Sequence, residues 1–276
     1  MKSQLKKIIP PRVGKLIKSS WLEVRRFYYT GNRYECPVCG HHFRKMLSGG
    51  FDLPVLKEKQ IVGGGYREND VCPYCLSTDR DRLIYLYLKY ESDFFNQPQT
   101  VLHIAPEPAL FRIFNKLDNL HYFPATKYTE GLYYGSGIQT ADLLDLQFET
   151  GTFDWVICNH VLEHIPNDQL AMQEIFRVLK PWGQAILQVP YSPILKKTFE
   201  DPTITSRADR EKYFGQFDHV RIYGTDYTSR LESAGFHVET IEQTKKYKTL
   251  GNLEKYALNP KEKLFVCKKI ENFKSL

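Results

Sequence analysis

The sequence predicts an α/β protein built around a parallel β-sheet. Three neighbouring segments carry this prediction. Residues 153–158 (FDWVIC) form a short apolar, β-branched run that is typical of a buried strand. Residues 169–179 repeat apolar side chains near helical spacing, and residues 185–189 (AILQV) form a second apolar run. Strand, helix and strand in this order make a right-handed βαβ unit, in which the two strands run parallel.

The segment 180–183 separates this helix from the second strand. Pro181 cannot continue a helix, because its nitrogen carries no hydrogen, and Gly183 accepts a left-handed cap. We therefore expect the helix to end at Leu179 and the strand to begin at Ala185.

The other elements alternate along the chain in the same way. Further strands are expected at residues 100–105, 121–125, 138–144, 236–241 and 263–266, and further helices at residues 77–90, 107–117 and 225–234. A long polar insertion, about residues 192–217, lies between the strand 185–189 and the last helix. Its length and polarity indicate a mobile lid over a substrate.

The chain's length and charge suggest one large domain and smaller N-terminal parts. We expect a basic arm (1–34), a small module (35–76), a connecting helix and linker (77–99) and a large domain (100–276). Before Glu35, nine lysines and arginines are opposed only by Glu23, which gives +8. Since the whole chain carries +6, the remainder carries −2. This balance argues against a broad polyanion-binding surface on the large domain.

The basic arm has an amphipathic pattern. Leu16, Ile17, Trp21, Val24 and Phe27 recur at helical spacing among basic residues. Three roles fit this pattern: packing on the chain's own domain, binding an anionic membrane surface, and binding RNA. The sequence has no secretory signal and no run of transmembrane length. We expect a cytoplasmic protein, with peripheral membrane binding as an alternative.

Four cysteines predict a metal site in the module 35–76. Cys36 and Cys39 form one CPxC turn, and Cys72 and Cys75 form another. Two such turns supply the four thiolates of a tetrahedral, structural Zn²⁺ site, which indicates a zinc ribbon. The alternative is four unligated thiols.

The segment from Asn159 to His164 follows the strand 153–158, at the edge where parallel sheets bind ligands. With its surroundings, FDWVICNHVLEHIPND…LKPWG…VP, it resembles class I S-adenosylmethionine-dependent methyltransferases that have an "hxLEHh" segment after strand four. The resemblance extends from about Thr100 to Lys269. It implies a Rossmann-like, doubly wound sheet of seven strands, mostly parallel. In this fold the last hairpin is antiparallel and strand seven inserts between strands five and six.

The resemblance also implies a cofactor site, with one departure from the family. The family has a glycine-rich loop, E/D-x-G-x-G-x-G, after the first strand, whereas this chain has His103, Ala105, Glu107 and Ala109 at those positions. In one reading, Ala105 is small enough for close approach and Glu107 pairs with the methionine ammonium of S-adenosylmethionine. In the other, the pocket is closed. The segment LHIAPE resembles a variant in bacterial methyltransferases with an N-terminal zinc ribbon, which favours the first reading.

Other cofactor contacts follow from the same resemblance. Asp142 would accept a hydrogen bond from the adenine amino group, with the Leu143 backbone N–H beside it, although Asp142 equally fits a cap or turn. Glu130 is a candidate for the ribose, and the alternative, that it is a solvated charge in a loop, fits it better. Asn159 and His160 would lie beside the sulfonium.

Histidines supply the catalytic candidates. His160 and His219 are the possible bases, and His164, Tyr191 and Arg221 are candidate substrate contacts, with lid anchoring as the alternative for His219 and Arg221. His160–His164 also fits the H-x-x-E-H pattern of a metallopeptidase. That pattern needs a continuous helix, which Pro166 disfavours.

The sequence therefore predicts methyl transfer from S-adenosylmethionine to a small molecule or saccharide. The alternatives are an RNA methyltransferase that grips phosphates with the basic arm, and a non-catalytic binding or scaffold protein on a degenerate fold.

Overall fold

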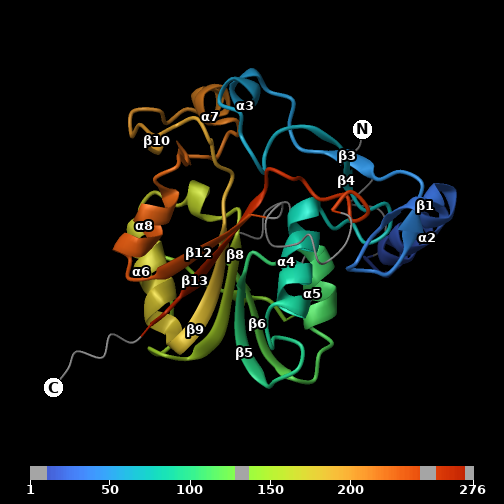
Figure 1. Ribbon diagram of the computed structural model, residues 1–276, viewed down its shortest axis with the longest axis horizontal. Coiled ribbons are helices and arrows are strands. Elements are labelled where there is room, and N and C mark those ends of the chain that lie inside the picture. The colour runs from blue at the N-terminus through green and yellow to red at the C-terminus, as the bar shows by residue number, and fades with distance from the viewer. Residues whose placement is uncertain (1–10, 128–136, 243–252, 271–276) are drawn as a thin grey trace.

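The computed structural model of the protein describes residues 11–127, 137–242 and 253–270. Its centre is a seven-stranded sheet with the order β12-β13-β9-β8-β5-β6-β7 (Figure 1). In chain order, these strands are β5 (Gln99–Ile104), β6 (Leu120–Thr126), β7 (Gln139–Thr140), β8 (Phe153–Asn159), β9 (Leu179–Gln188), β12 (His237–Glu242) and β13 (Lys263–Lys268).

The strand directions confirm the predicted topology. Strands β7, β6, β5, β8 and β9 run parallel. Strand β13 is antiparallel to both β9 and β12, so the last strand lies between the fifth and the sixth. Because the parallel strands all end at one edge, the loops after β5, β6, β7 and β8 meet there.

Helices cover both faces of the sheet. On one face, α4 (Asp79–Tyr90) and α5 (Pro108–Phe114) pack over strand residues such as Val101 and Trp155. On the other face, α6 (Asp168–Val178) and α8 (Tyr227–Ser233) pack over residues such as Val156 and Leu187. Figure 1 shows the two pairs on opposite sides of the strands. Helix α4, predicted as a connection, is thus part of the large domain's core.

Two predicted boundaries are wrong. Strand β9 begins at Leu179, directly after α6, because the segment 180–183 forms a bulged start of the strand rather than a turn. Trp182 takes the left-handed conformation there (φ 64°), and Gly183 leaves no room for a side chain. Strand β7 stops at Thr140, because the Asp142 carboxylate accepts a hydrogen bond from the Leu144 N–H and turns the chain.

The N-terminal part consists of a helix and two small hairpins. Helix α2 (Pro11–Tyr29) leads into β1 (Thr30–Glu35), which pairs with β2 (His42–Phe43). Strand β3 (Leu47–Gly49) pairs with β4 (Arg67–Val71). These hairpins pack against α5 through a cluster that includes Phe43 and Ala109. They therefore sit on the large domain rather than apart from it.

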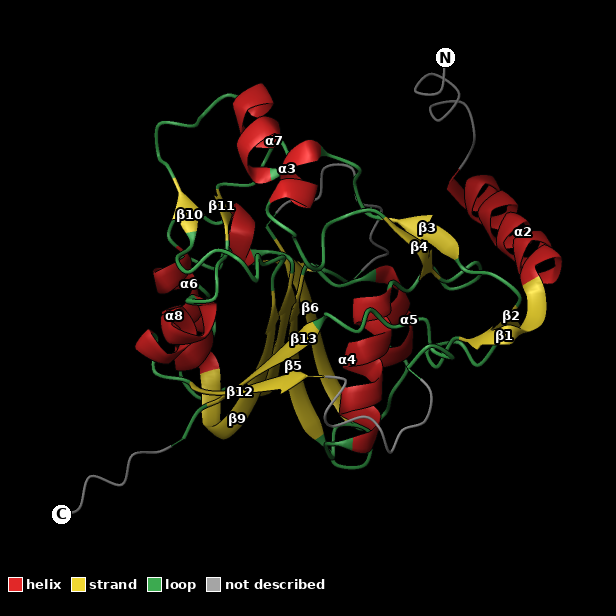
Figure 2. Ribbon diagram, turned by 45° about the horizontal axis from the view of Figure 1, so that its top comes forward, coloured by secondary structure: helices red, strands yellow, loops and turns green. Residues whose placement is uncertain are grey.

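Several large apolar side chains of helix α2 do not pack on the domain. Trp21, Val24 and Phe27 are 61%, 61% and 79% exposed. The helix projects from the body of the molecule (Figure 2), and Arg25 contacts the carbonyl of Pro73. Packing on the chain's own domain is therefore the wrong alternative for this apolar face. None of the helices described here is both long and apolar enough to cross a membrane.

Candidate active site at the strand ends

The two neighbouring strands β5 and β8 end in unusual backbone conformations. Ala105 has φ 46° and His160 has φ 52°, both in the left-handed region. For residues with a side chain this conformation costs about 1–2 kcal/mol, and such strain gathers at functional sites. Ala105 stands at a position where the family has glycine. The loop after β5 therefore keeps the backbone shape that glycine favours.

Glu107 links these two strand ends. Its Oε2 lies 2.9 Å from Nε2 of His103, and its Oε1 accepts a hydrogen bond of 2.9 Å from the Asn159 side chain. Burial favours the neutral acid, but the hydrogen bonds from His103 and Asn159 hold the pKa of Glu107 below its usual value. The ends of β5 and β8 thus hold a carboxylate in a fixed position beside the strained loop.

Asp81, from the first turn of α4, adds a second acid that the sequence did not reveal. Burial, and then the charge of Glu107, raise its pKa to about 7. Its Oδ1 and the Oδ1 of Asn159 are buried and have no hydrogen-bond partner among the described residues. The spacing Thr78-x-x-Asp81 is a helix capping box, and the structure confirms that cap. In the sequence, the capping box is a sufficient reason for an aspartate at position 81. The pattern therefore does not show that this carboxylate also lies near Glu107.

These acceptors fit the amino-acid part of S-adenosylmethionine. Its ammonium group carries a positive charge and three N–H donors, which are what unpaired buried acceptors require. The pairing of Glu107 with the methionine ammonium stays a prediction, because His103 and Asn159 already contact the two oxygens of Glu107.

Asp142 lies at the end of β7 and has partners within the protein. Its Oδ1 accepts from the Leu144 N–H at 3.1 Å, and its Oδ2 pairs with Lys127 at 2.5 Å. The hydrogen bond from Lys127 has the largest effect on the pKa of Asp142 and lowers it, and the hydrogen bond from the Leu144 N–H lowers it further. The turn role is therefore observed, and the adenine contact remains a prediction for Asp142 and Leu143. Glu130 lies outside the described residues.

We expect Asp142→Ala to weaken S-adenosylhomocysteine binding by about 1–3 kcal/mol, if the carboxylate also holds adenine. Calorimetric titration measures this change. Lys127→Met is the control, because it removes the partner and leaves the carboxylate free. An Asp142→Ala protein with unchanged affinity would assign this residue to the turn alone.

Three histidines surround Glu163 after β8. The turn Leu162–His164 is a single 3₁₀ turn (η1), and Nδ1 of His160, Nε2 of His164 and Nε2 of His219 lie 3.4, 4.0 and 4.0 Å from Oε1 of Glu163. Because His160 ends a strand and His164 lies in this turn, they do not share a helix face. The H-x-x-E-H pattern is therefore not a metallopeptidase site.

Burial controls the protonation of two of these histidines. It lowers the pKa of His160 well below the usual value, and the charges of Arg80, His219 and His164 lower it further. Burial, and then the charge of His164, lower the pKa of His219 to about 3. Both rings are therefore neutral near pH 7, but the lowered pKa values also make them weak proton acceptors, so the base role of each stays a prediction.

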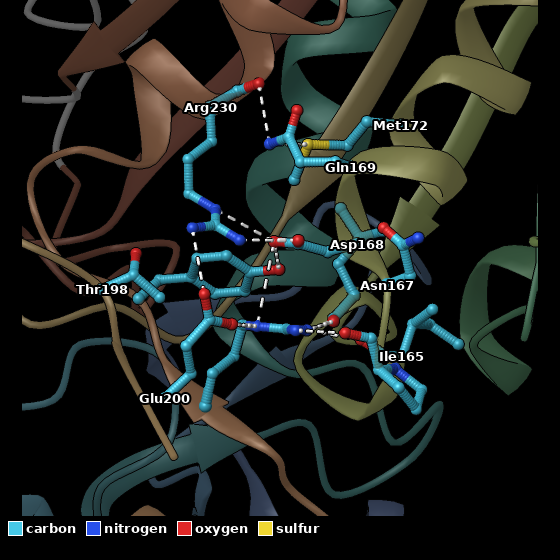
Figure 3. A network of polar contacts seen from close by, with 12 residues as sticks. Ile165, Asn167, Asp168, Gln169, Met172, Thr198, Glu200 and Arg230 are labelled. Carbon is cyan, nitrogen blue, oxygen red and sulfur yellow. Dashed lines mark hydrogen bonds and ion pairs between the residues drawn. The ribbon is translucent and has the colours of Figure 1, made fainter. Parts of the chain in front are cut away.

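Arg221 is not available to a substrate. It is buried, and it donates to the carbonyls of Leu162, Ile165 and Pro166 and to the carboxylate of Glu200. Its neighbour Asp168 accepts from Arg230 at 2.6 Å, in a network that also contains Glu200 (Figure 3). The contacts favour the anchoring alternative for Arg221, which fixes β11 (Arg221–Ile222) against η1.

The predicted lid is folded. It contains β10 (Phe199–Glu200), which pairs with β11, and α7 (Arg207–Phe214). Tyr191, also predicted as a substrate contact, is buried against Phe265, and its hydroxyl donates to the carbonyl of Lys261. Of the three predicted substrate contacts, His164, Tyr191 and Arg221, only His164 has a partly exposed side chain, and it belongs to the histidine cluster around Glu163.

The segment between the two CPxC turns forms one wall of the site. Its helix α3 (Pro54–Glu58) packs on α7 through Leu56 and Phe214, and the two helices lie side by side in Figure 2. A side chain at Gly63 would lie 3.4 Å from the His160 ring, and the Gly63 carbonyl accepts from Arg80. A small pocket beside His219 lies between these parts, lined also by Phe51, Leu56, Ile61, Pro190 and Phe214. The long segment between the two cysteine pairs therefore helps to enclose the site at the strand ends.

The four cysteines of the CPxC turns come together. Sγ of Cys36 lies 3.6 Å from Sγ of Cys75, Sγ of Cys39 lies 3.8 Å from Sγ of Cys72, and all four sulfurs lie within 4.8 Å of one another. Sulfurs about 2.3 Å from a tetrahedral zinc ion lie about 3.8 Å apart. The four thiols therefore fit the ion.

Comparison with known proteins supports a methyltransferase. Residues 119–187 match the family model described as a methyltransferase domain. A demethylmenaquinone methyltransferase of Staphylococcus carnosus is 36% identical over 62 residues, which is 21% of this chain. The match covers 26% of that protein, so the chain matches about a quarter of its relative's length.

Solved structures give broader and weaker likenesses. A Haloferax volcanii protein described as a methyltransferase, solved with the activator Trm112, is 15% identical, with a TM-score of 0.43, covering 70% of this chain and 94% of that one. The phosphoethanolamine N-methyltransferase 2 of Haemonchus contortus, solved with S-adenosylmethionine, is 15% identical, with a TM-score of 0.43, covering 65% and 51%.

The family match and the strand order agree. Residues 119–187 are similar to a methyltransferase domain, and the sheet has the seven-stranded order of the class I S-adenosylmethionine-dependent methyltransferase fold.

Proposed function

We propose that this protein transfers a methyl group from S-adenosylmethionine to a small-molecule or saccharide acceptor. The observation that carries the proposal is the group of Glu107, Asp81 and Asn159 at the strand ends. Oδ1 of Asp81 and Oδ1 of Asn159 are buried acceptors with no partner among the described residues, and the Glu107 carboxylate beside them is held by His103 and Asn159. Parallel sheets bind ligands at this edge.

The residues divide the work as follows. Glu107 and Asp81 hold the ammonium, Ala105 allows close approach of the backbone, and Asp142 with the Leu143 N–H is assigned to adenine. When bound, the cofactor supplies an activated methyl group on a sulfonium sulfur. The protein's task is therefore to align the acceptor and exclude water. For an acceptor that must lose a proton, His160 and His219 are the neutral bases nearest the strand ends.

The shape of the site supports a small acceptor. The pocket beside His219 is small and mostly apolar, and α3 and α7 close over it. The RNA alternative is favoured by one observation, the exposed helix α2 with its basic residues. A steep loss of RNA affinity with rising salt would support that alternative.

We propose that the cysteine cluster holds a structural Zn²⁺ ion. Four protein thiolates fill a tetrahedral coordination sphere, so the ion has no open position for catalysis. Its role is to fix β1, β4 and the segment between them, which includes the wall over the histidines.

The test of the proposed function is binding of S-adenosylhomocysteine and its loss in Glu107→Gln. This change keeps the size of the side chain but removes its charge, and we expect affinity to fall by about 1.5–3 kcal/mol, about 10- to 150-fold. Calorimetric titration measures the affinity, and Glu149→Gln, at an exposed position, is the control.

Two outcomes would count against the proposal. Equal affinities of the Glu107→Gln and wild-type proteins would remove the ammonium site. No heat and no thermal shift for the wild type at millimolar ligand would instead support the non-catalytic scaffold.

A further inference from the structure

We propose that Glu163, His164 and His219 form a second metal site, which binds a divalent first-row transition metal ion. One carboxylate oxygen and one nitrogen from each imidazole converge here, and these three atoms lie within 4.8 Å of one another. None of the three residues belongs to the cysteine cluster. With an ion bound, His219 is a ligand, so His160 is the remaining candidate base for the proposed methyl transfer. The site follows from side chains that the methyl-transfer proposal leaves without a complete explanation.

The carboxylate of Glu163 is the strongest reason for an ion. The side chain is 1% exposed, and neither of its oxygens has a hydrogen-bond partner in the described part of the chain. Burying a carboxylate without partners costs several kcal/mol, so such groups in native proteins pair with a cation or coordinate a metal. Nε2 of His219 is also buried without a partner there. Nε2 of His219 and Oε1 of Glu163 thus lie 4.0 Å apart, and Nδ1 of His160 lies 3.4 Å from the same oxygen.

The remaining ring nitrogens are held as they are in metal sites. Nδ1 of His164 lies 3.3 Å from the carboxylate of Asp218, which leaves its Nε2 turned to Glu163. The backbone of Phe214 hydrogen-bonds the His219 ring, which leaves its Nε2 free. Metal-binding histidines almost always have this second contact, because it fixes the tautomer and aims the ligand atom.

The backbone around the site is also fixed. The Val220 N–H donates to the Glu163 carbonyl at 2.9 Å, and Arg221 holds the carbonyls of Leu162 and Ile165. These bonds therefore hold Glu163 and His219, which are 56 positions apart in the sequence, next to each other. Around a tetrahedral ion, nitrogen and oxygen ligands lie about 3.4 Å apart. The separations of 4.0 Å are about 0.6 Å longer than this value, so the ligand side chains would have to rotate slightly toward one another to bind an ion.

The donor set selects the kind of ion. Two imidazoles and a carboxylate suit zinc, manganese, iron or cobalt, whereas Ca²⁺ and Mg²⁺ prefer oxygen ligands alone. Three protein ligands leave positions open. Since His219 lines the pocket between α3 and α7, an open position would face an oxygen atom of the acceptor. This last point rests on the proposed methyl transfer, whereas the metal site itself does not.

The experiment is a metal-binding titration of the full chain. Mn²⁺ is the first probe, because it binds nitrogen and oxygen ligands and avoids thiolates, so the cysteine cluster does not report it. We expect the wild type to bind one equivalent of Mn²⁺ by equilibrium dialysis and elemental analysis, and two equivalents of Zn²⁺. Glu163→Gln and His219→Gln should each lose at least about tenfold in Mn²⁺ affinity and retain one Zn²⁺, and Asp218→Asn should lose about tenfold.

The controls separate this site from the cofactor site. His121→Gln removes an exposed histidine of β6 and should bind Mn²⁺ like the wild type. Glu163→Gln should bind S-adenosylhomocysteine normally, so failure of the metal site and failure of the cofactor site give different results. The inference is overturned if wild type binds no Mn²⁺ and only one Zn²⁺ at about 1 mM free metal, or if folded Glu163→Gln and His219→Gln proteins retain full affinity. Should a variant not fold, the wild-type stoichiometry decides alone.

Discussion

Cys36→Ser is expected to release zinc and unfold the N-terminal hairpins. A structural zinc ion contributes binding free energy directly to folding, about 10 kcal/mol or more in small zinc peptides. Cys36 is fully buried in a small cluster in which Phe43 and Met46 are the largest fully buried side chains, so the apolar core that remains without the ion is small. We expect the variant to lose its cysteine-bound equivalent of zinc and to melt at a much lower temperature. Elemental analysis and thermal denaturation measure both effects.

The effect should extend beyond the hairpins. The segment that carries Gly63 is tied at both ends to the cysteine cluster and forms a wall beside His160. Loss of zinc should therefore weaken S-adenosylhomocysteine binding as well. Cys267→Ala, in β13 and far from the cluster in sequence, is the matched control and should keep its zinc. A Cys36→Ser protein that melts like the wild type with zinc bound would refute the site.

Arg221→Met should destabilise the protein by about 3–5 kcal/mol. The guanidinium is 3% exposed, and its removal leaves three carbonyls and the Glu200 carboxylate without their donor. Breaking a buried ionic network in this way is costly, because the remaining groups stay buried and unpaired. Urea unfolding measures the change in the free energy of unfolding.

The same substitution should also release His219 from Glu163. Since Arg221 holds η1 against β11, the Mn²⁺ equivalent should be lost even where the protein still folds. Arg207→Met is the control, because Arg207 is exposed and stacks on Phe217 at 3.9 Å from the ring centroid. A loss below about 1 kcal/mol for Arg221→Met would show that the network does not support the fold.

Local patterns predicted the sheet well and its edges less well. The apolar runs at β8 and β9 identified the parallel core, because buried strands need continuous apolar residues. The segment 180–183 was misread, since proline and glycine serve in a bulged strand as well as in a turn. Asp81 was missed, because no local pattern places it near Glu107. Arg221 and Tyr191 were read as substrate contacts, although both are buried.

The sequence by itself determined the fold class, the two cysteine pairs and the edge of the sheet at which ligands bind. These depend on short-range patterns: apolar periodicity, CPxC spacing and the order of strands and helices. Only the tertiary structure decided which polar groups meet. Asp81 of α4 lies near enough to Glu107 for that charge to raise its pKa, and His219 lies 4.0 Å from Glu163. Such encounters involve residues tens of positions apart, and no local pattern records them.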